Sequence, residues 1–298
     1  MAVVATGFFD GVHLGHRLVI DTLLRAARER GEQSVVVTFW PHPRTVLQKD
    51  ARELRLLSSL QEKRAMLASL GVDRMEVVDF SREFRSLTAA EYLRSWVRER
   101  LGGTAVVLGY DNRMGSDGLP HDAIVPLAQS LGLAVIECPA VSGVFPSGSA
   151  ISSTKIRAVL ERGEVAAAEA MLGYRYGLHG VVVAGNRLGR TLGFPTANMQ
   201  LYEPLKLVPA NGVYLTEVET VGRHFYGMTN IGVRPTVSGA GVRTIETHIF
   251  DFDELIYGLD LRLRFVSRIR AEQRFDSLEA LKAQLSADEA LCRALLAK

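Results

Sequence analysis

The stretch GFFDGVHLGH, residues 7–16, decides how the first half of this chain folds. It follows a short apolar run at residues 3–5 and precedes an amphipathic stretch, so it lies where a buried strand gives way to a helix. Ligands of a parallel sheet bind at such turns, and the unpaired N–H groups of a helix start attract phosphates. His13 and His16 add side-chain donors on either side of Gly15. Two histidines in this setting predict a phosphate site rather than a tight turn with surface histidines.

Short apolar runs alternate with amphipathic patterns on the C-terminal side of this turn. The runs are rich in β-branched residues and do not alternate in polarity, as expected of strands buried on both faces. The predicted strands cover residues 3–5, 34–39, 75–78, 105–108 and 134–136. The predicted helices cover residues 16–30, 60–70, 89–101, 122–131, 154–162 and 164–172. This alternation predicts an α/β domain with a Rossmann-like, doubly wound parallel sheet.

The pattern changes near residue 173, where strands and turns replace helices. The predicted strands cover residues 178–184, 212–221, 224–231, 243–252 and 259–266. Consecutive short strands without helices indicate a barrel or a sandwich. An amphipathic helix with Ser277 as its N-cap closes the chain over residues 277–296. We therefore expect two domains, residues 1–172 and 173–298.

The bulk composition narrows the function without deciding it. The chain has 298 residues, 47% of them hydrophobic and 23% charged, which is enough for about two globular domains. A formal net charge of +2 gives no field that would favour a nucleic acid or a membrane surface as partner. Cys138 and Cys292 lie far apart and form no CxxC motif, so neither a disulfide framework nor a structural zinc is expected. The short apolar start is interpreted as a strand and no run approaches bilayer length, so we expect a cytoplasmic protein.

A second anion-binding pattern is ISSTKIR, residues 151–157. Ser152 and Ser153 are interpreted as the N-cap of a helix that carries Lys155 and Arg157 in its first turn. Hydroxyls, backbone N–H groups and a guanidinium together suit a leaving pyrophosphate. Taken alone, the same pattern describes an ordinary capped helix with solvated charges.

A glycine-rich loop marks the second half of the chain. Gly185, Gly189 and Gly193 recur every four residues after a predicted strand. This spacing indicates a loop whose backbone closely approaches a neighbouring group or ligand. Thr196 and Asn198 follow, and their oxygens could both reach a hard cation such as Mg²⁺. Neither a Walker A lysine motif nor the protein-kinase signatures are present in the sequence. On spacing alone, an ordinary barrel loop is equally compatible with this pattern.

The predicted strand over residues 243–252 alternates in polarity, so that Glu246 and His248 share one face. Glu246 is a candidate general base for a hydroxyl nucleophile. The alternative for this glutamate is a solvated or paired surface charge, and the sequence leaves both open.

Nine ordered motifs together give the chain a resemblance to a known family. They cover nearly its whole length and include both HxGH and GFPTAN in one polypeptide. The motifs are GFFDGVHLGH (7–16), TFWPHPRTVL (38–47), LGYDNRMG (108–115), ISSTKIR (151–157), NRLGRTLGFPTAN (186–198), NGVY (211–214), NIGVRPTV (230–237), RTIETHIFDF (243–252) and RIRAEQRFDSLEAL (268–281). By these motifs the chain resembles the bacterial bifunctional riboflavin kinase/FMN adenylyltransferases, also called FAD synthetases.

The resemblance implies two ATP-dependent reactions, with Mg²⁺ as cofactor and flavins as substrates and products. An N-terminal domain of the HxGH nucleotidylyltransferase type would transfer AMP from ATP to FMN, giving FAD and pyrophosphate. A C-terminal six-stranded antiparallel β-barrel with a terminal helix would phosphorylate riboflavin at its 5′-hydroxyl. The oligomeric state is left open.

The resemblance also implies roles for individual residues. Groups of the first domain that would hold ATP or its phosphates are Gly7, Phe9, Asp10, His13, Gly15, His16, Ser153, Thr154 and Arg157. Groups of the kinase that would hold MgATP are Gly185, Gly189, Gly193, Thr196 and Asn198, the last two at the metal. Glu246 would be the base of the kinase, and His13 and His16 would act in adenylyl transfer. Asp111 and Arg270 would contact flavin.

Four positions depart from the family pattern. Phe8 stands where the family often has Asn, and Trp40 replaces an acidic residue. Asn112 and Met114 occupy places that are usually aromatic. These departures bear on flavin contacts in the first domain more than on ATP binding.

Two other functions remain compatible with the sequence. One is a nucleotidylyltransferase for another substrate, such as a pantetheine or nicotinamide phosphate, that carries a barrel which only binds. The other is a flavin-binding sensor or carrier whose catalytic sites have decayed. The intact sets of motifs argue against both.

Overall fold

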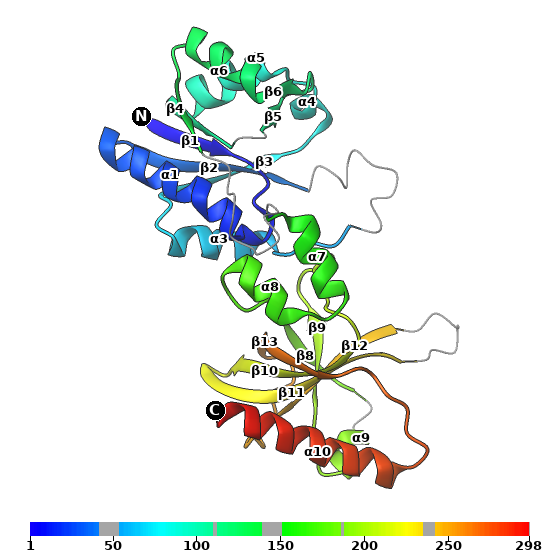
Figure 1. Cartoon of the computed structure of the whole chain (residues 1–298). Helices are drawn as coiled ribbons and strands as arrows, with labels where there is room; N and C mark the ends of the chain where they lie inside the picture. Colours follow the sequence, from blue (N-terminus) through cyan, green and yellow to red (C-terminus); the bar gives the residue numbers. More distant parts are fainter. Residues whose placement is uncertain (42–53, 110–111, 139–150, 186–187, 235–241, 298) are drawn as a thin grey trace. The chain divides into compact units, whose positions relative to one another are not determined.

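The computed structural model describes residues 1–41, 54–109, 112–138, 151–185, 188–234 and 242–297 (Figure 1). The chain divides into two compact units, Met1–Ser153 and Thr154–Lys298, and each is described by itself. Among the described residues, no helix combines the length and the apolar character that crossing a membrane requires.

The first unit is built on a five-stranded parallel sheet with the strand order β3-β2-β1-β4-β7. The strands are β1 (Ala2–Thr6), β2 (Gln33–Trp40), β3 (Arg74–Asp79), β4 (Gly103–Leu108) and β7 (Ala134–Glu137). The central strand β1 pairs with β2 on one side and with β4 on the other. The doubly wound sheet predicted from the non-alternating apolar runs is therefore confirmed.

Helices cover both faces of this sheet (Figure 1). They are η1 (Asp10–Val12), α1 (Leu14–Arg30), α3 (Leu60–Ser69), α4 (Arg82–Arg85), α5 (Ala89–Glu91), η3 (Tyr92–Arg100) and α6 (His121–Ser130). A short hairpin of β5 (Arg113–Met114) and β6 (Leu119–Pro120) precedes α6.

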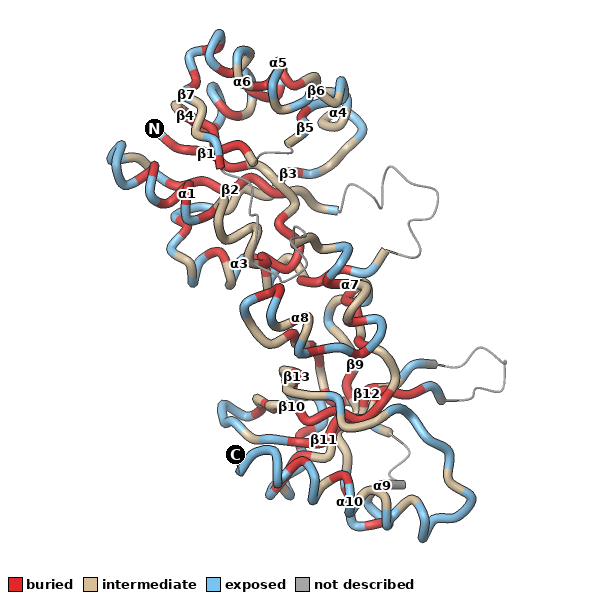
Figure 2. The backbone as a smooth tube through the Cα atoms, in the orientation of Figure 1, coloured by how far each residue is buried: buried red, intermediate tan, exposed pale blue. Residues whose placement is uncertain are grey.

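Successive residues of β1 supply two separate cores. Val3 packs with Ile20 and Leu23 of α1, whereas Val4 packs with Leu93 of η3 and Ile124 of α6. This follows from the two-residue period of a strand, which sends neighbouring side chains to opposite faces. The central strands β1, β2 and β4 are buried along most of their length, whereas the edge strands β3 and β7 are mostly half-buried or exposed (Figure 2).

The second unit is a closed six-stranded antiparallel barrel with the order β10-β11-β12-β9-β8-β13. The strands are β8 (Gly177–Val183), β9 (Ala197–Leu201), β10 (Gly212–Thr220), β11 (Arg223–Arg234), β12 (Val242–Ile249) and β13 (Asp260–Arg270). The helices of this part are α7 (Ser153–Glu161), α8 (Val165–Leu172), α9 (Leu188–Thr191) and α10 (Leu278–Leu296). The expected barrel and closing helix are confirmed.

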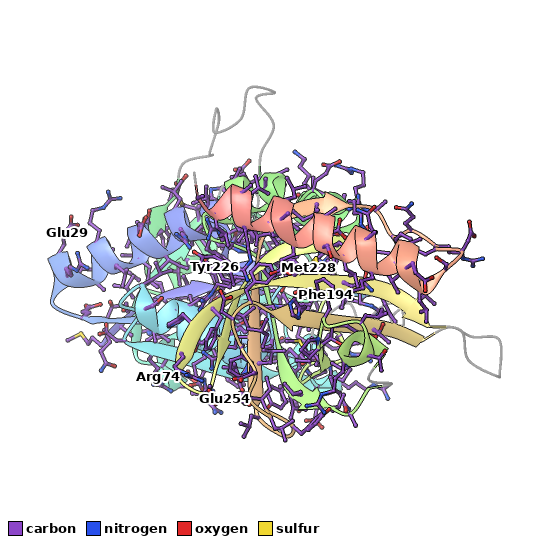
Figure 3. The ribbon with its side chains drawn as sticks, turned by 90° about the horizontal axis from the view of Figure 1, so that it is seen from below. Glu29, Arg74, Phe194, Tyr226, Met228 and Glu254 are labelled. Carbon is purple, nitrogen blue, oxygen red and sulfur yellow. The ribbon has the colours of Figure 1, made fainter. Side chains whose placement is uncertain are left out.

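Helix α10 begins at the expected N-cap, because the Ser277 hydroxyl accepts a hydrogen bond from the backbone N–H of Ala280 at 3.1 Å. Its inner face packs on a cluster that includes Met228 of β11 and Phe194, both labelled in Figure 3. The same cluster contains Cys292, which is fully buried.

Two details of the barrel differ from the sequence-based expectations. The strand expected over residues 243–252 ends at Ile249, because the chain turns at Asp251, whose φ is 55°. Strand β9 was not expected, and it contains Asn198. Its sequence ANMQL mixes polar and apolar residues without the β-branched run that marks the other strands.

Helix α8 and the end of α7 lie with the barrel in the second unit. The N–H of Ala210 donates to the Leu160 carbonyl at 2.9 Å, and the Arg268 guanidinium donates to the Arg162 carbonyl at 3.1 Å. The division of the two activities after residue 172 stays a prediction.

Candidate active sites

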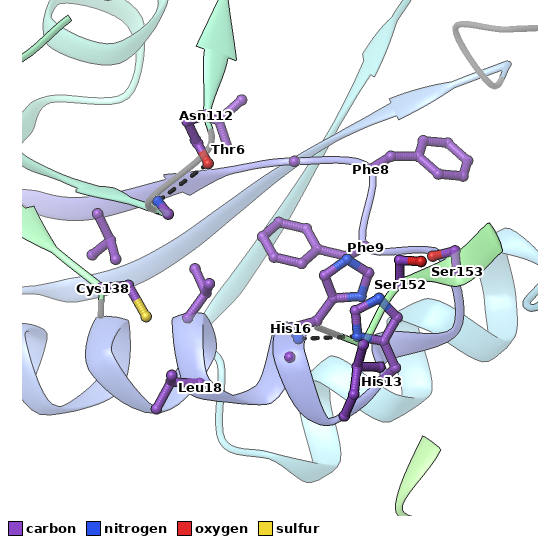
Figure 4. A pocket seen from close by; sticks show the side chains of 16 residues that line it. Thr6, Phe8, Phe9, His13, His16, Leu18, Asn112, Cys138, Ser152 and Ser153 are labelled. Carbon is purple, nitrogen blue, oxygen red and sulfur yellow. Dashed lines mark hydrogen bonds between the residues drawn. The ribbon is translucent and has the colours of Figure 1, made fainter. Parts of the chain in front are cut away.

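The HxGH segment forms a strained turn between β1 and α1 (Figure 4). Phe9 and Val12 have φ values of 52° and 38°, and Gly11 between them has 76°. Left-handed backbone is unfavourable for an aromatic or β-branched residue, so the surroundings must hold it in place. Such retained strain is typical of functional turns.

Asp10 is the main anchor of this turn. Its carboxylate is 2% exposed and accepts hydrogen bonds from the N–H groups of Leu57 and Ser58, both at 3.0 Å. In return, the N–H of Gly11 donates to the Ser58 hydroxyl at 3.0 Å. The resemblance placed Asp10 among the groups that would hold ATP or its phosphates. In the structure these bonds tie the turn to a segment more than forty residues away.

His13 and His16 lie face to face at the start of α1. Their rings are stacked with centroids 3.6 Å apart, and the Phe9 ring meets His16 edge-on at 5.2 Å (Figure 4). Nδ1 of His13 accepts the His16 N–H at 3.3 Å, so in the neutral imidazole the ring proton is on Nε2. A Cβ on Gly15 would lie 3.3 Å from the His13 ring, so glycine lets the pair stack closely against the helix.

Burial, followed by the charges of His13 and Lys63, holds the pKa of His16 well below its usual 6.5. His16 is therefore a neutral hydrogen-bonding group at physiological pH. It can donate to a phosphate oxygen without the cost of burying a second positive charge.

A cavity of about 350 Å³ opens in front of these histidines. Six of the positions predicted to hold ATP line it: Gly7, Phe9, His13, Gly15, His16 and Ser153. Asp10 does not line the cavity but anchors the turn that carries these residues. Its carbonyl accepts a hydrogen bond from the Ser153 hydroxyl at 3.1 Å.

Other predicted groups of the first site are not brought to it by the described contacts. Thr154 and Arg157 begin the second unit, so their roles at the phosphate stay predictions. Asp111 lies outside the described residues. Among the departures from the family pattern, Phe8 and Asn112 line the cavity, whereas Met114 is buried in the core.

A row of polar residues crosses three strands of the barrel. Glu246 on β12 is the register partner of Asn230 on β11 and of Asn198 on β9. Directly opposed residues of antiparallel strands point to the same face with Cβ atoms about 5 Å apart. The register thus places an amide on each side of the candidate base.

The glycines of the second motif let the loop approach this row. A Cβ on Gly185 would lie 2.3 Å from the Asn198 side chain, and one on Gly189 would lie 2.3 Å from the Phe194 carbonyl oxygen. Gly193 has φ of 89°, which an L-residue adopts only with strain. Each glycine of the motif therefore has a physical requirement of its own.

A cavity of about 320 Å³ lies over the polar row. Its polar lining comes from Thr196, Asn230, Glu246, His248, Arg270, Glu272 and Gln273. Glu246 and His248 of β12 share a face, as the alternation predicted. Its apolar lining comes from Leu192, Phe194, Val213, Met228, Phe275, Leu281 and Leu285. A flat, largely apolar ligand with one polar end fits this division of the walls.

Arg270 lies at the rim of the same cavity. Its guanidinium pairs with the buried Asp288 of α10 at 2.8 Å, and its carbon Cζ lies 5.7 Å from the Phe275 ring centroid. The pair fixes Arg270 beside the cavity, while its contact with flavin stays a prediction.

A further cavity of about 190 Å³ lies next to the glycine-rich loop. Thr196 lines both cavities of the barrel unit. The other walls of the smaller cavity include Arg190, Phe252, Ile256 and Tyr257. Thr196 thus stands between two adjoining compartments.

Two family models match the chain, one on each half. The model described as FAD synthetase matches residues 1–155, and the model described as riboflavin kinase matches residues 172–296. Bifunctional riboflavin kinase/FMN adenylyltransferases from Listeria monocytogenes and Escherichia coli are each 37% identical to it. The alignments cover 99% and 98% of this chain and 93% and 91% of those relatives.

The chain belongs to the bifunctional riboflavin kinase/FMN adenylyltransferase family. A solved structure described as a macrolide-efflux protein from Streptococcus pneumoniae has the same fold, with a TM-score of 0.89 and 34% identity. The comparison covers 98% of this chain and 93% of that one. Its description differs from those of the two family models and the curated relatives, which agree on flavin enzymes.

The expected Mg²⁺ can be compared with the side chains that the kinase unit offers as ligands. Among the described residues no three His, Cys, Asp or Glu side chains gather as metal ligands. The donor set at the loop is instead a hydroxyl and an amide, Thr196 and Asn198. Mg²⁺ commonly takes one or two protein oxygens and completes its shell with phosphates and water, so this sparse set fits the ion when ATP accompanies it.

Sequence reasoning missed two residues of these sites. Asn230 was inside a predicted strand and within a recognised motif, and the pairing register alone reveals its place beside Glu246. Lys63 was assigned to an amphipathic helix, where a lysine is normally exposed, yet it is fully buried behind the HxGH turn. No local signal distinguishes this lysine from a surface one.

Proposed function

We propose that this chain converts riboflavin to FMN and FMN to FAD, using one ATP in each reaction. Residues 173–298 phosphorylate riboflavin, and residues 1–172 transfer AMP to FMN and release pyrophosphate. One observation carries the proposal: the stacked histidine pair lines a cavity in one unit, and Glu246 with its register partner Asn230 lines a cavity in the other.

In the first unit, the histidine pair binds ATP phosphates at the start of α1. The helix N-terminus contributes N–H groups and a partial positive charge, His13 contributes a ring donor, and His16 contributes a neutral one. The FMN phosphate is already an anion and attacks the α-phosphorus without a general base. Catalysis therefore consists of positioning and of stabilising the charge that develops on the phosphoryl oxygens.

The second unit acts on a neutral alcohol, so a base is required. Glu246 accepts the proton of the riboflavin 5′-hydroxyl as its oxygen attacks the γ-phosphorus. The flanking amides of Asn198 and Asn230 orient the reacting groups. The isoalloxazine ring occupies the apolar end of the 320 Å³ cavity, with Arg270 at its rim.

The smaller cavity of this unit suits the nucleoside of ATP. It adjoins Thr196 on the side away from Glu246, and Phe252, Ile256 and Tyr257 offer apolar surface for a base. ATP bound there points its phosphates past Thr196 toward Glu246. The flavin and the nucleotide thus approach the reacting centre from opposite sides.

Thr196 and Asn198 would hold Mg²⁺ through their side-chain oxygens. The ion, when bound with ATP, neutralises phosphate charge and thereby favours transfer. Gly185 lets the loop close against the Asn198 amide, which keeps that amide beside Glu246.

Two rival functions make different predictions. A nucleotidylyltransferase for another phosphate ester, with a barrel that only binds, would form no ADP from riboflavin and MgATP. A flavin sensor or carrier with decayed sites would bind flavin tightly without turnover. The Glu246 row opposes the first rival, and the intact stacked histidines oppose the second.

We place the enzyme in the cytoplasm, where both cysteines, which are buried and not in a disulfide, are stable as thiols. Its partners are ATP, riboflavin, FMN and FAD, and we assign neither a nucleic acid nor a membrane as partner.

The test is a time course with purified chain, riboflavin, ATP and Mg²⁺, with the products resolved as FMN, FAD, ADP and pyrophosphate. We expect ADP to accompany FMN formation and pyrophosphate to accompany FAD formation, with FMN appearing first. FMN without FAD, or no ADP at all, would contradict one half of the proposal.

A further inference from the structure

Lys63 of α3 is a buried charged side chain that the proposed mechanism does not use. It is fully buried, with 0% exposure. Its ammonium donates to the Phe8 carbonyl at 2.6 Å and to the Thr38 hydroxyl at 3.1 Å. The Thr38 hydroxyl donates in turn to the same carbonyl at 3.1 Å, and the ammonium lies 3.8 Å from the centre of the Phe8 ring.

This location is unfavourable for a lysine by itself. Burial lowers its pKa from the usual 10.5 to about 8, although the attraction of Asp10 opposes the shift. Lys63 also lies in the first turn of α3, which begins after the Ser59 cap, and cations are disfavoured at a helix N-terminus. An apolar side chain of similar length would avoid both costs. A buried lysine that is unfavourable for stability points to a role in function.

The contact of Lys63 lies at the entrance of the HxGH turn. Phe8 precedes the strained Phe9, so holding the Phe8 carbonyl fixes the first peptide of the turn. The segment just before α3 holds the next part, because Leu57 and Ser58 bind the Asp10 carboxylate. Helix α3 therefore secures the turn at two successive points.

The charge of Lys63 also reaches the histidines. It contributes to the lowered pKa of His16, after burial and His13. Among the described residues, the charged and titratable groups near the ammonium include Asp10 from η1, His16 from α1 and, on its own helix, Glu62, which is engaged in the cap with Ser59. A phosphate bound at the histidines would thus lie above a buried positive charge.

We propose that Lys63 is a positioning residue for adenylyl transfer: its ammonium holds the Phe8 carbonyl, and with it the His13–His16 phosphate site, in the geometry that the reaction needs. This inference rests on the proposed function of the first unit. Lys63 does not line the cavity, so it acts through the turn and through its field rather than by touching the nucleotide.

One consequence is that FAD formation should lose activity at alkaline pH, whereas riboflavin phosphorylation should not. The pH dependence of kcat/KM reports groups of the free enzyme. As the Lys63 ammonium loses its proton near pH 8, kcat/KM for FAD formation from FMN should fall. The phosphates of FMN and ATP are already fully ionised there, so they do not cause this loss.

The experiment compares the full-length wild-type chain with Lys63→Gln and Lys63→Met between pH 7 and 9.5. Glutamine keeps N–H donors but loses the charge, and methionine loses both. We expect kcat/KM for FAD formation to drop about a hundredfold in Lys63→Met, and less in Lys63→Gln, because a displaced site costs about that much. The residual activity of Lys63→Gln should be independent of pH above 8. Riboflavin phosphorylation by the same samples is the control and should be unchanged.

Wild-type kcat/KM for FAD formation that stays flat from pH 7 to 9.5 would refute the predicted alkaline loss of activity, and a Lys63→Met chain with wild-type kcat/KM at every pH would overturn the proposal. So would a Lys63→Gln chain with wild-type rates and the wild-type loss of activity at alkaline pH. A wild-type chain that forms no FAD at any pH would instead refute the proposed function itself.

Discussion

The two phosphate sites of this molecule are built on opposite principles. In the first unit, a strained turn at the edge of a parallel sheet presents a helix N-terminus and two stacked imidazoles, of which His16 has a lowered pKa. In the barrel unit, the register of antiparallel strands aligns a carboxylate between two amides. Among the described residues, the lining of the first cavity is rich in donors and holds no carboxylate, whereas the second cavity is lined by the carboxylates of Glu246 and Glu272.

The difference follows from the nucleophile that each site would serve. A phosphate monoester arrives as an anion, so its site needs donors that tolerate negative charge. An alcohol must lose a proton during attack, so its site needs a base. The presence of a carboxylate in one cavity and not in the other, within the described residues, therefore discriminates between the two half-reactions.

The largest expected effect is at the base of the kinase site. Glu246→Gln keeps the shape of the side chain but removes its ability to take the hydroxyl proton. We expect the rate of riboflavin phosphorylation to fall by about 10² to 10⁴. FAD formation from supplied FMN should be unchanged, and product analysis by chromatography measures both. A variant that retains its kinase rate would remove Glu246 from the mechanism.

A somewhat smaller effect is expected at the histidine pair. His16→Ala removes one neutral donor and the stacking partner of His13. FAD formation from FMN should fall by about 10² to 10³, the usual cost of one preorganised donor. Riboflavin phosphorylation is the internal control for folding and should persist. Loss of both activities from a folded chain would contradict separate sites.

The smallest effect is expected at Gly185 of the glycine-rich loop. Gly185→Ala places a Cβ against the Asn198 side chain and should displace its amide. We expect the KM of the kinase for MgATP to rise about tenfold, the value of one polar contact. Asn198→Ala is the matched comparison, and the double variant should be no worse than Asn198→Ala alone. Additive losses would show that Gly185 acts elsewhere.

Much of the fold was predictable because buried strands carry an unambiguous local pattern. The runs that became β1, β2 and β4 are β-branched and continuously apolar. The break between the strands predicted over residues 212–221 and 224–231 contains Gly222, whose φ of 72° suits a two-residue turn, whereas Val221 adopts φ of 48° against the preference of a β-branched residue. Strand β9 escaped because its place is set by its neighbours β8 and β12, which its own residues do not reveal.

The sites were predictable where a motif is local and not where it is assembled. His13 and His16 lie three residues apart, and this spacing predicts a phosphate site. Asn230 joins Glu246 only through strand pairing, and Lys63 joins the first site across 55 residues of sequence. The anchoring of Asp10 by Leu57 and Ser58 is of the same kind. Long-range partners can be identified only from the tertiary structure, because the residues between them in the sequence do not indicate the contact.

Mixing two single-site variants tests the central claim, two sites that each act alone, most directly. Glu246→Gln chains should make FMN from riboflavin about 10² to 10⁴ times more slowly than wild type, and His16→Ala chains should make FMN but form FAD about 10² to 10³ times more slowly. Incubated together with riboflavin, ATP and Mg²⁺, they should form FAD through FMN that one variant makes and the other consumes. A mixture that forms FMN yet no FAD, while wild-type chain under the same conditions forms both, would contradict the account.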